Sequence, residues 1–122
     1  MAGQEDYKAV GIDYEAGLRR FVGNTALYEK YLYRFPQEQE YFHMCQAMQE
    51  EDYTEAFKQA HALKGVTATL GLTELYCEVS ELVEALRAGD TELAWDRLES
   101  VRKSWKQVAD MLEKQRVYAK QP

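Results

Sequence analysis

The sequence is poor in residues that break helices, with two prolines and seven glycines among 122 residues. Its two cysteines, Cys45 and Cys77, stand far apart and form no CxxC pair. This disfavours a disulfide framework and a structural zinc site. No apolar run approaches the roughly 20 residues that span a bilayer, and the polar, acidic start does not resemble a signal peptide. The formal net charge of −6 argues against nucleic acid or an anionic membrane as partner.

The abundant residues, Leu, Ala, Glu, Lys, Gln and Met, favour helix over sheet. We therefore expect a soluble, cytoplasmic, all-α protein. Short connections between the last helices predict antiparallel neighbours, so the expected architecture is an up-down four-helix bundle with a short N-terminal capping helix. We place one domain at residues 12–118, with loose segments at 1–11 and 119–122.

Two helices are predicted in the N-terminal half. Asp13 is the N-cap of a short helix that ends at Gly23. The side chains that this helix is expected to bury are Leu18, Phe21 and Val22. Asn24 begins a second helix, which Pro36 should kink or split. The apolar positions of the second helix are Leu27, Tyr31, Phe35, Phe42, Cys45 and Met48.

Three more helices follow. Asp52 and Glu55 form the start of the third, and Gly71 ends it. Its apolar stripe is Tyr53, Ala56, Ala60, Leu63, Thr67 and Leu70. The fourth runs from near Thr73 to Gly89 and buries Leu75, Val79, Leu82 and Leu86. The last starts near Asp90 or Thr91, with Trp95, Leu98, Val101, Trp105, Val108 and Leu112 on its core face.

The residue of chemical interest is His61 in the third predicted helix. At about 100° per residue, it points roughly 130° away from the centre of the apolar stripe, so its imidazole should face solvent. Lys64 and Gly65 lie three and four positions on, which puts them beside His61 on the same surface. Ala68 continues this patch by one turn, and Phe57 borders it on the other side.

These residue types suit phosphoryl transfer. An exposed imidazole is a good nucleophile toward phosphorus, with a lone pair available near neutral pH. Lys64 supplies a flexible cation that can neutralise phosphoryl oxygens. Gly65 costs about 1 kcal/mol relative to alanine in an exposed helix interior, which indicates that something approaches the helix backbone closely.

The sequence has neither a carboxylate cluster beside His61 for Mg²⁺ nor a Gly-rich nucleotide loop. We therefore expect no cofactor bound by this chain, no kinase or other enzyme activity of its own, and Mg²⁺ in the partner.

The pattern around His61 resembles the histidine-phosphotransfer (HPt) family of two-component phosphorelays. That family has a His followed by Leu-Lys-Gly, then small residues and a Gly ten positions after the His. The matching residues here are His61, Leu63, Lys64, Gly65, Ala68 and Gly71. Residues 11–35 are also similar to the family's opening, in which a short helix precedes a long one. The resemblance covers the chain from about Gly11 to the last helix.

The resemblance implies a phosphoryl shuttle in which His61 exchanges phosphoryl with the aspartate of a response-regulator receiver domain. Receiver domains and a hybrid sensor histidine kinase are the implied partners, and we expect a monomer. Docking would use the third and fourth helices around His61. The predicted docking residues are Phe57, Ala68, Val83 and Arg87.

Two alternatives remain open at this stage: a helical interaction module that is never phosphorylated, and an HPt domain detached from a hybrid or chemotaxis-type kinase. His43 lacks the helical Lys-Gly neighbours of His61 and is interpreted as a surface or packing residue. A haem or metal bundle is disfavoured, because two histidines without Glu-x-x-His spacing supply too few ligands.

Overall fold

The computed structural model describes residues 3–119, with side chains described through Arg116. Its elements are α1 (Gln4–Ala9), α2 (Tyr14–Arg20), α3 (Thr25–Arg34), the 3₁₀ turn η1 (Phe35–Gln37), α4 (Gln39–Gln49), α5 (Tyr53–Leu70), α6 (Thr73–Arg87) and α7 (Thr91–Ala119). The described residues contain no strand, so the all-α prediction is confirmed. Of the C-terminal end that we expected to be loose, Ala119 is helical and residues 120–122 lie outside the described part.

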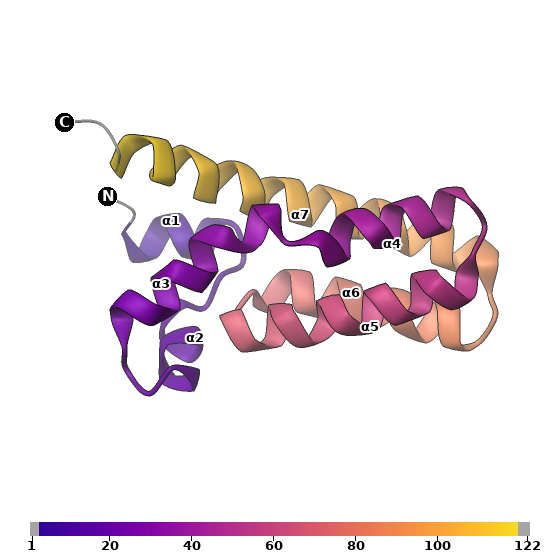
Figure 1. The fold of residues 1–122 in the computed structure, drawn as a ribbon, viewed down its shortest axis with the longest axis horizontal. Helices are drawn as coiled ribbons and strands as arrows, with labels where there is room; N and C mark the ends of the chain where they lie inside the picture. Colours follow the sequence, from indigo (N-terminus) through magenta and orange to yellow (C-terminus); the bar gives the residue numbers. More distant parts are fainter. Residues whose placement is uncertain (1–2, 120–122) are drawn as a thin grey trace.

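Four helices, α4 to α7, form the body of the molecule. Figure 1 shows them side by side, each running opposite to the one before it in the chain. The α4–α5 and α6–α7 loops lie at one end, on the right of the view. The α5–α6 turn lies toward the other end, where α1, α2 and α3 gather. The helix α5 therefore runs between α4 and α6 with one side facing outward.

The predicted helix starts at Asp13, Asn24 and Asp52 rest on local capping, and the structure confirms them, whereas α2 ends at Arg20 rather than at Gly23. The side chains of Asp13, Asn24 and Asp52 each accept a hydrogen bond from the backbone N–H three residues on, at 3.1, 3.1 and 3.2 Å. Gly71 ends α5 in the left-handed conformation, with φ of 75°. Pro36 lies in η1 between α3 and α4, so it splits the second predicted helix in two.

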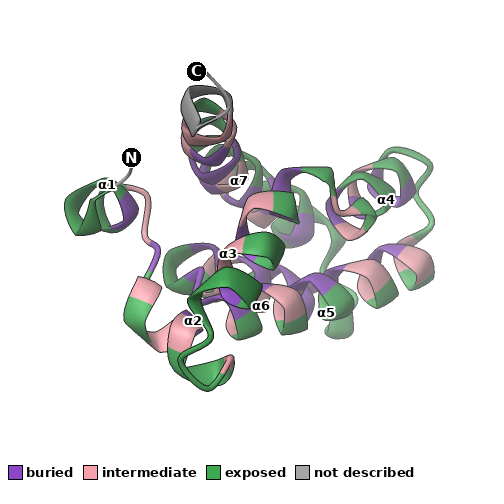
Figure 2. Ribbon diagram, turned by 60° about the vertical axis from the view of Figure 1, so that its left-hand side comes forward, coloured by how far each residue is buried: buried purple, intermediate pink, exposed green. Residues whose placement is uncertain are grey.

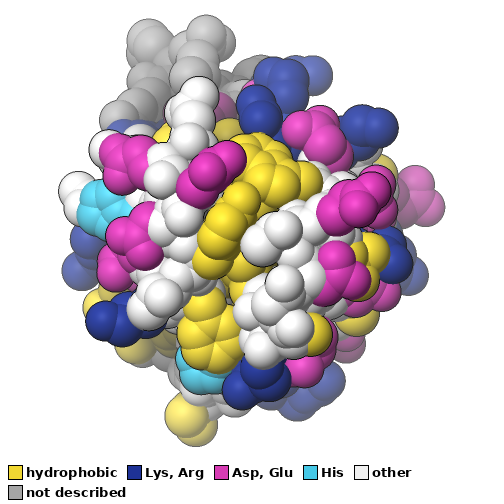
Figure 3. Space-filling view, turned by 90° about the vertical axis from the view of Figure 1, so that its right-hand side faces the viewer, with side chains coloured by type: hydrophobic (Ala, Val, Ile, Leu, Met, Phe, Trp, Pro, Cys, Tyr) yellow, Lys and Arg dark blue, Asp and Glu magenta, His cyan; other side chains and the backbone are white. Residues whose placement is uncertain are grey.

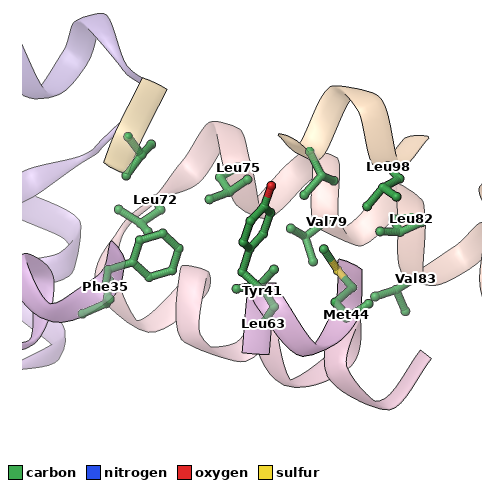
Figure 4. Close-up of a cluster of buried hydrophobic side chains, with 14 of the residues drawn as sticks. Phe35, Tyr41, Met44, Leu63, Leu72, Leu75, Val79, Leu82, Val83 and Leu98 are labelled. Carbon is green, nitrogen blue, oxygen red and sulfur yellow. The ribbon is translucent and has the colours of Figure 1, made fainter. Parts of the chain in front are cut away.

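The core lies between the four long helices (Figure 4). The apolar stripes predicted for the last three helices are largely confirmed. Their buried members are Ala56, Ala60, Leu63, Thr67, Leu70, Leu75, Val79, Leu82, Leu98, Val101, Val108 and Leu112. Tyr53, Leu86 and Trp105 are only half-buried. Because each helix was assigned from an unbroken run with clear ends, its rotation followed from the sequence.

The buried faces predicted for α3 and α4 are wrong at three positions. Leu27, Tyr31 and Phe42, which we expected inside, are exposed. Phe35 and Met48 are buried as predicted, and Cys45 is half-buried. The other buried residues of α3 and α4 are Tyr28, Leu32, Tyr41, Met44 and Ala47. The break at Pro36 lets the two helices rotate independently, so a single stripe drawn through the proline does not fit both of them.

Two further residues expected in the core are exposed. Val22 is 94% exposed and adopts φ of 54°, because it lies in the turn after α2 rather than on the helix. Trp95 is 38% exposed. Its indole N–H donates a hydrogen bond of 3.3 Å to the hydroxyl of Tyr53 at the loop end of the bundle.

The N-terminal segment is not loose as predicted, because residues 4–9 form α1. Tyr7 is only 6% exposed, and its hydroxyl lies 2.7 Å from that of Tyr33 in α3. Burial raises the pKa of Tyr7, so the phenol stays protonated and can donate in this pair. This contact joins residues 26 positions apart, and the local sequence carries no sign of it.

Candidate functional site

His61 lies on the outer face of α5 and is exposed, as predicted. Figure 2 shows why: the buried residues of α5 face the bundle, and its other side is exposed or half-buried. Phe57, one turn earlier, places its ring 6.0 Å from the imidazole, measured between centroids. The imidazole therefore has a half-buried aromatic neighbour on one side and open solvent on the other.

Cationic side chains surround His61, although the chain as a whole is acidic. Between Phe57 and Gly65 the only charged residues are Lys58 and Lys64. The Lys64 ammonium lies 6.0 Å from the ring centroid of Tyr76, which directs this half-buried side chain toward α6. The local positive charge favours an incoming anionic group.

Arg87 completes this cationic border from the end of α6. Its guanidinium lies 5.1 Å from the ring centroid of Phe57, and its Nε is 3.4 Å from a carboxylate oxygen of Glu84. Both partners are exposed, so the ion pair contributes little to stability. The guanidinium thus sits over the ring that also borders His61.

Gly65 leaves the surface beside His61 open. A Cβ added at Gly65 would meet nothing within 4 Å, so no packing requirement explains the glycine. An open groove of about 700 Å³ begins here. Its walls include Tyr31 and Arg34 from α3, and Ala62, Gly65, Val66 and Thr69 from α5.

The predicted site residues come together, with one exception. Phe57, Lys64, Gly65 and Ala68 share the outer part of α5 with His61, and Arg87 reaches them through Phe57. Val83, which we expected to be exposed for docking, is fully buried. It lies one turn after buried Val79 on the inner face of α6, near Met44 and Leu82 in Figure 4, so the docking prediction for it is wrong.

Sequence reasoning missed several residues of this surface. Lys58 is exposed three positions before His61, and helical spacing alone could have identified it. Tyr31 and Arg34 border the groove from α3, about 30 residues away in the chain. Tyr76 contacts the Lys64 ammonium from α6. No local pattern signals these last three, because their position depends on how the helices pack.

Within residues 3–119, no group of three or more His, Cys, Asp or Glu side chains is placed to hold a metal ion. No described helix has both the length and the apolar character needed to cross a membrane.

Comparison with known protein families identifies the family to which the chain belongs. The Hpt domain family matches residues 38–116, which span α4 to α7 and well over half of the sequence. The protein therefore belongs to the Hpt domain family. Hpt domains are phosphocarrier modules with a histidine phosphotransfer role in two-component systems, and they interact with response-regulator receiver domains and kinases.

The family match begins at Glu38, so it does not include residues 11–35, which we compared with the family's opening. No curated protein and no solved structure matches the chain.

Proposed function

We propose that His61 is the phosphoacceptor of this protein and that it exchanges phosphoryl with the aspartate of a response-regulator receiver domain. The observation that carries the proposal is an exposed imidazole beside a glycine whose missing side chain leaves open space. A protein that only scaffolds other proteins has no need for that combination. Lys64 and the groove beside Gly65 support the proposal as the charged and the steric parts of the same surface.

The transfer would be an in-line displacement at phosphorus. The lone pair of an imidazole nitrogen attacks, a P–N bond forms, and the P–O bond to the aspartate breaks, with the carboxylate as leaving group. The chain's own contribution is to hold the imidazole accessible and to supply positive charge near the phosphoryl oxygens. Mg²⁺ and the acidic pocket that holds it would belong to the receiver.

Docking would occur over Gly65 and the groove next to it. Tyr31 and Val66 give this groove apolar surface, and Arg34 adds a cation at its border. A receiver domain settled there would bring its aspartate over the outer face of α5. This proposal extends the docking surface toward α3, and Val83 has no part in it.

A direct test is phosphoryl transfer from radiolabelled receiver domains. A panel of receivers phosphorylated with a small-molecule donor is mixed with the wild-type chain and Mg²⁺, and the label on each protein is followed over time. We expect at least one receiver to lose its label to the chain. If every receiver retains its label, or loses it only to water, the proposed role as a phosphoryl shuttle is wrong.

Lys64→Ala is expected to slow transfer roughly tenfold to a hundredfold, because a positioned cation near the phosphoryl oxygens is lost. The variant should remain folded, since Lys64 is only half-buried and its ammonium lies against the face of Tyr76. Lys64→Arg, which keeps the charge, should recover part of the rate. Rapid-mixing transfer kinetics and thermal unfolding separate the two effects. A Lys64→Ala protein that melts early would indicate a structural role instead.

Gly65→Gln is expected to reduce transfer by about tenfold or more by obstructing docking, with the imidazole unaltered. The helix itself should gain up to about 1 kcal/mol, because glutamine is a better helix former and its Cβ meets nothing within 4 Å. Gly65→Ala is the matched control, with the same helical gain and little added bulk. Equal transfer rates for the glutamine and alanine variants would contradict the close-approach argument.

A further inference from the structure

A second surface lies at the loop end of the bundle. Figure 3 shows a band of hydrophobic side chains that crosses this end, with acidic side chains on both sides. Tyr53 and Phe57 are half-buried, one turn apart on α5, and Trp95 of α7 is 38% exposed. The indole N–H of Trp95 bonds to the Tyr53 hydroxyl, so the two rings are held together. We call Tyr53, Phe57 and Trp95 the aromatic band.

The borders of the aromatic band concentrate the negative charge of the protein. The segments 50–57 and 88–96 carry no Lys or Arg, and their acidic residues are Glu50, Glu51, Asp52, Glu55, Asp90, Glu92 and Asp96. Together they contribute seven negative charges, one more than the formal net charge of −6. The rest of the chain therefore has a formal net charge close to zero. None of the seven forms an ion pair with another described residue.

The acidic borders flank the part of the band formed by Tyr53 and Trp95, because at the other end Phe57 lies under the Arg87 guanidinium and next to Lys58 in the chain. Partly exposed aromatic side chains between these borders define the chemistry of an occupant. We propose that the aromatic band docks a cationic amphipathic helix of a partner protein, with apolar residues on the band and Lys or Arg over its two borders. A second copy of this chain fits poorly, because a symmetric contact would place acidic borders against each other. Anionic lipid and nucleic acid would be repelled in the same way.

The band also reaches the phosphorylation site proposed above. Phe57 belongs to the band, borders His61 and lies under the Arg87 guanidinium. A helix bound here would therefore lie next to the acceptor histidine, on the opposite side from the groove at Gly65. This second docking site goes beyond the transfer role and does not require it.

The test uses the full chain and a labelled peptide of leucine and lysine at helical spacing, about 15 residues long so that it can form a helix when bound. Binding is followed by fluorescence anisotropy, and a leucine–glutamate peptide with the same spacing is the control. We expect only the cationic peptide to bind, with affinity that falls as salt is raised. Trp95→Ala should weaken binding by about tenfold or more.

Charge variants at the two ends of the molecule test whether the cationic peptide binds at the aromatic band. Neutralising Glu51, Glu92 and Asp96 together should weaken binding about tenfold, whereas neutralising Glu5 and Glu15, at the other end of the molecule, should have little effect. Trp95→Phe should retain binding, which guards against misfolding of the alanine variant. His61→Gln should bind as wild type does, so this test and the transfer test can fail separately.

Three results would overturn the proposal: no binding of the cationic peptide, equal binding of both peptides, or binding that is unchanged in folded Trp95→Ala. A wild-type dimer that Trp95→Ala dissociates, seen by analytical ultracentrifugation, would assign the surface to self-association instead.

Discussion

Replacing His61 by glutamine is expected to abolish phosphoryl acceptance while leaving the fold and its stability unchanged. Glutamine is close in size and polar, and the His61 side chain is exposed, so no core contact is lost. The amide nitrogen of glutamine has no lone pair comparable to that of an imidazole, so it cannot form the P–N bond. The measurement is the transfer of label from a phosphorylated receiver, with circular dichroism to verify the helical content.

The control for this prediction is the second histidine of the chain. His43 is also exposed, but it lies on α4 without a lysine or glycine one turn later. His43→Gln should accept phosphoryl at the wild-type rate. If His61→Gln still accepts label and His43→Gln does not, the site has been assigned to the wrong histidine. If both variants accept it, the acceptor is another residue type.

Replacing Gly71 by alanine is expected to destabilise the protein by roughly 3–5 kcal/mol, the largest stability effect that we predict for one added methyl group. Gly71 is buried and adopts φ of 75°, which alanine disfavours. Its Cβ would also collide with the carbonyl oxygen of Asp13 and lie 2.9 Å from the backbone nitrogen of Gly17. These are backbone atoms at the start of α2, and they cannot move away without displacing that helix.

A variant at Gly89 separates the cost of the left-handed backbone conformation from the cost of the steric collision. It has nearly the same conformation, φ of 72°, but a Cβ there would meet nothing within 4 Å. Gly89→Ala should therefore show the conformational cost alone, about 1–2 kcal/mol. Urea unfolding of both variants gives the comparison. Equal losses for Gly71→Ala and Gly89→Ala would show that the close approach of α2 to Gly71 contributes little.

The contact at Gly71 also has a consequence for the site. The Asp13 N–H donates a 2.7 Å hydrogen bond to the Gly71 carbonyl, and the Tyr28 hydroxyl donates one of 2.8 Å to the Leu70 carbonyl. Together they fix α2 and α3 to the end of α5. Because Tyr31 of α3 borders the groove beside Gly65, these bonds set the width of the proposed docking surface.

The sequence predicted α5 and the position of His61 on it because both depend on local features. Asp52 and Gly71 mark the two ends of the helix, and its apolar stripe is regular between them. A helix with defined ends and one apolar face has a defined outer face as well, so the exposure of His61 followed directly. The core pattern of the resemblance to the HPt family then rested on residues of this helix and on the Gly71 that ends it.

What the sequence did not predict depends on contacts between distant segments. Tyr7 is buried because Tyr33 satisfies its hydroxyl, and Tyr28 because the Leu70 carbonyl does. Tyrosines with such partners pack inside, whereas Tyr31 stays at the surface, and composition does not distinguish them. Val83 was misplaced for a related reason: on α6 its position is set by packing against two neighbouring helices, and the spacing of the leucines alone does not show the width of the buried face.

The most direct test of the central claim is the chemical stability of the phosphate on the labelled protein. Phosphoryl held on an imidazole nitrogen of His61 is expected to be lost in mild acid and retained in alkali. A label that is lost in alkali would indicate an acyl phosphate on an Asp or Glu side chain. A label that survives acid would indicate a phosphate ester on Ser, Thr or Tyr. Either result would contradict the account of His61 as the phosphoacceptor.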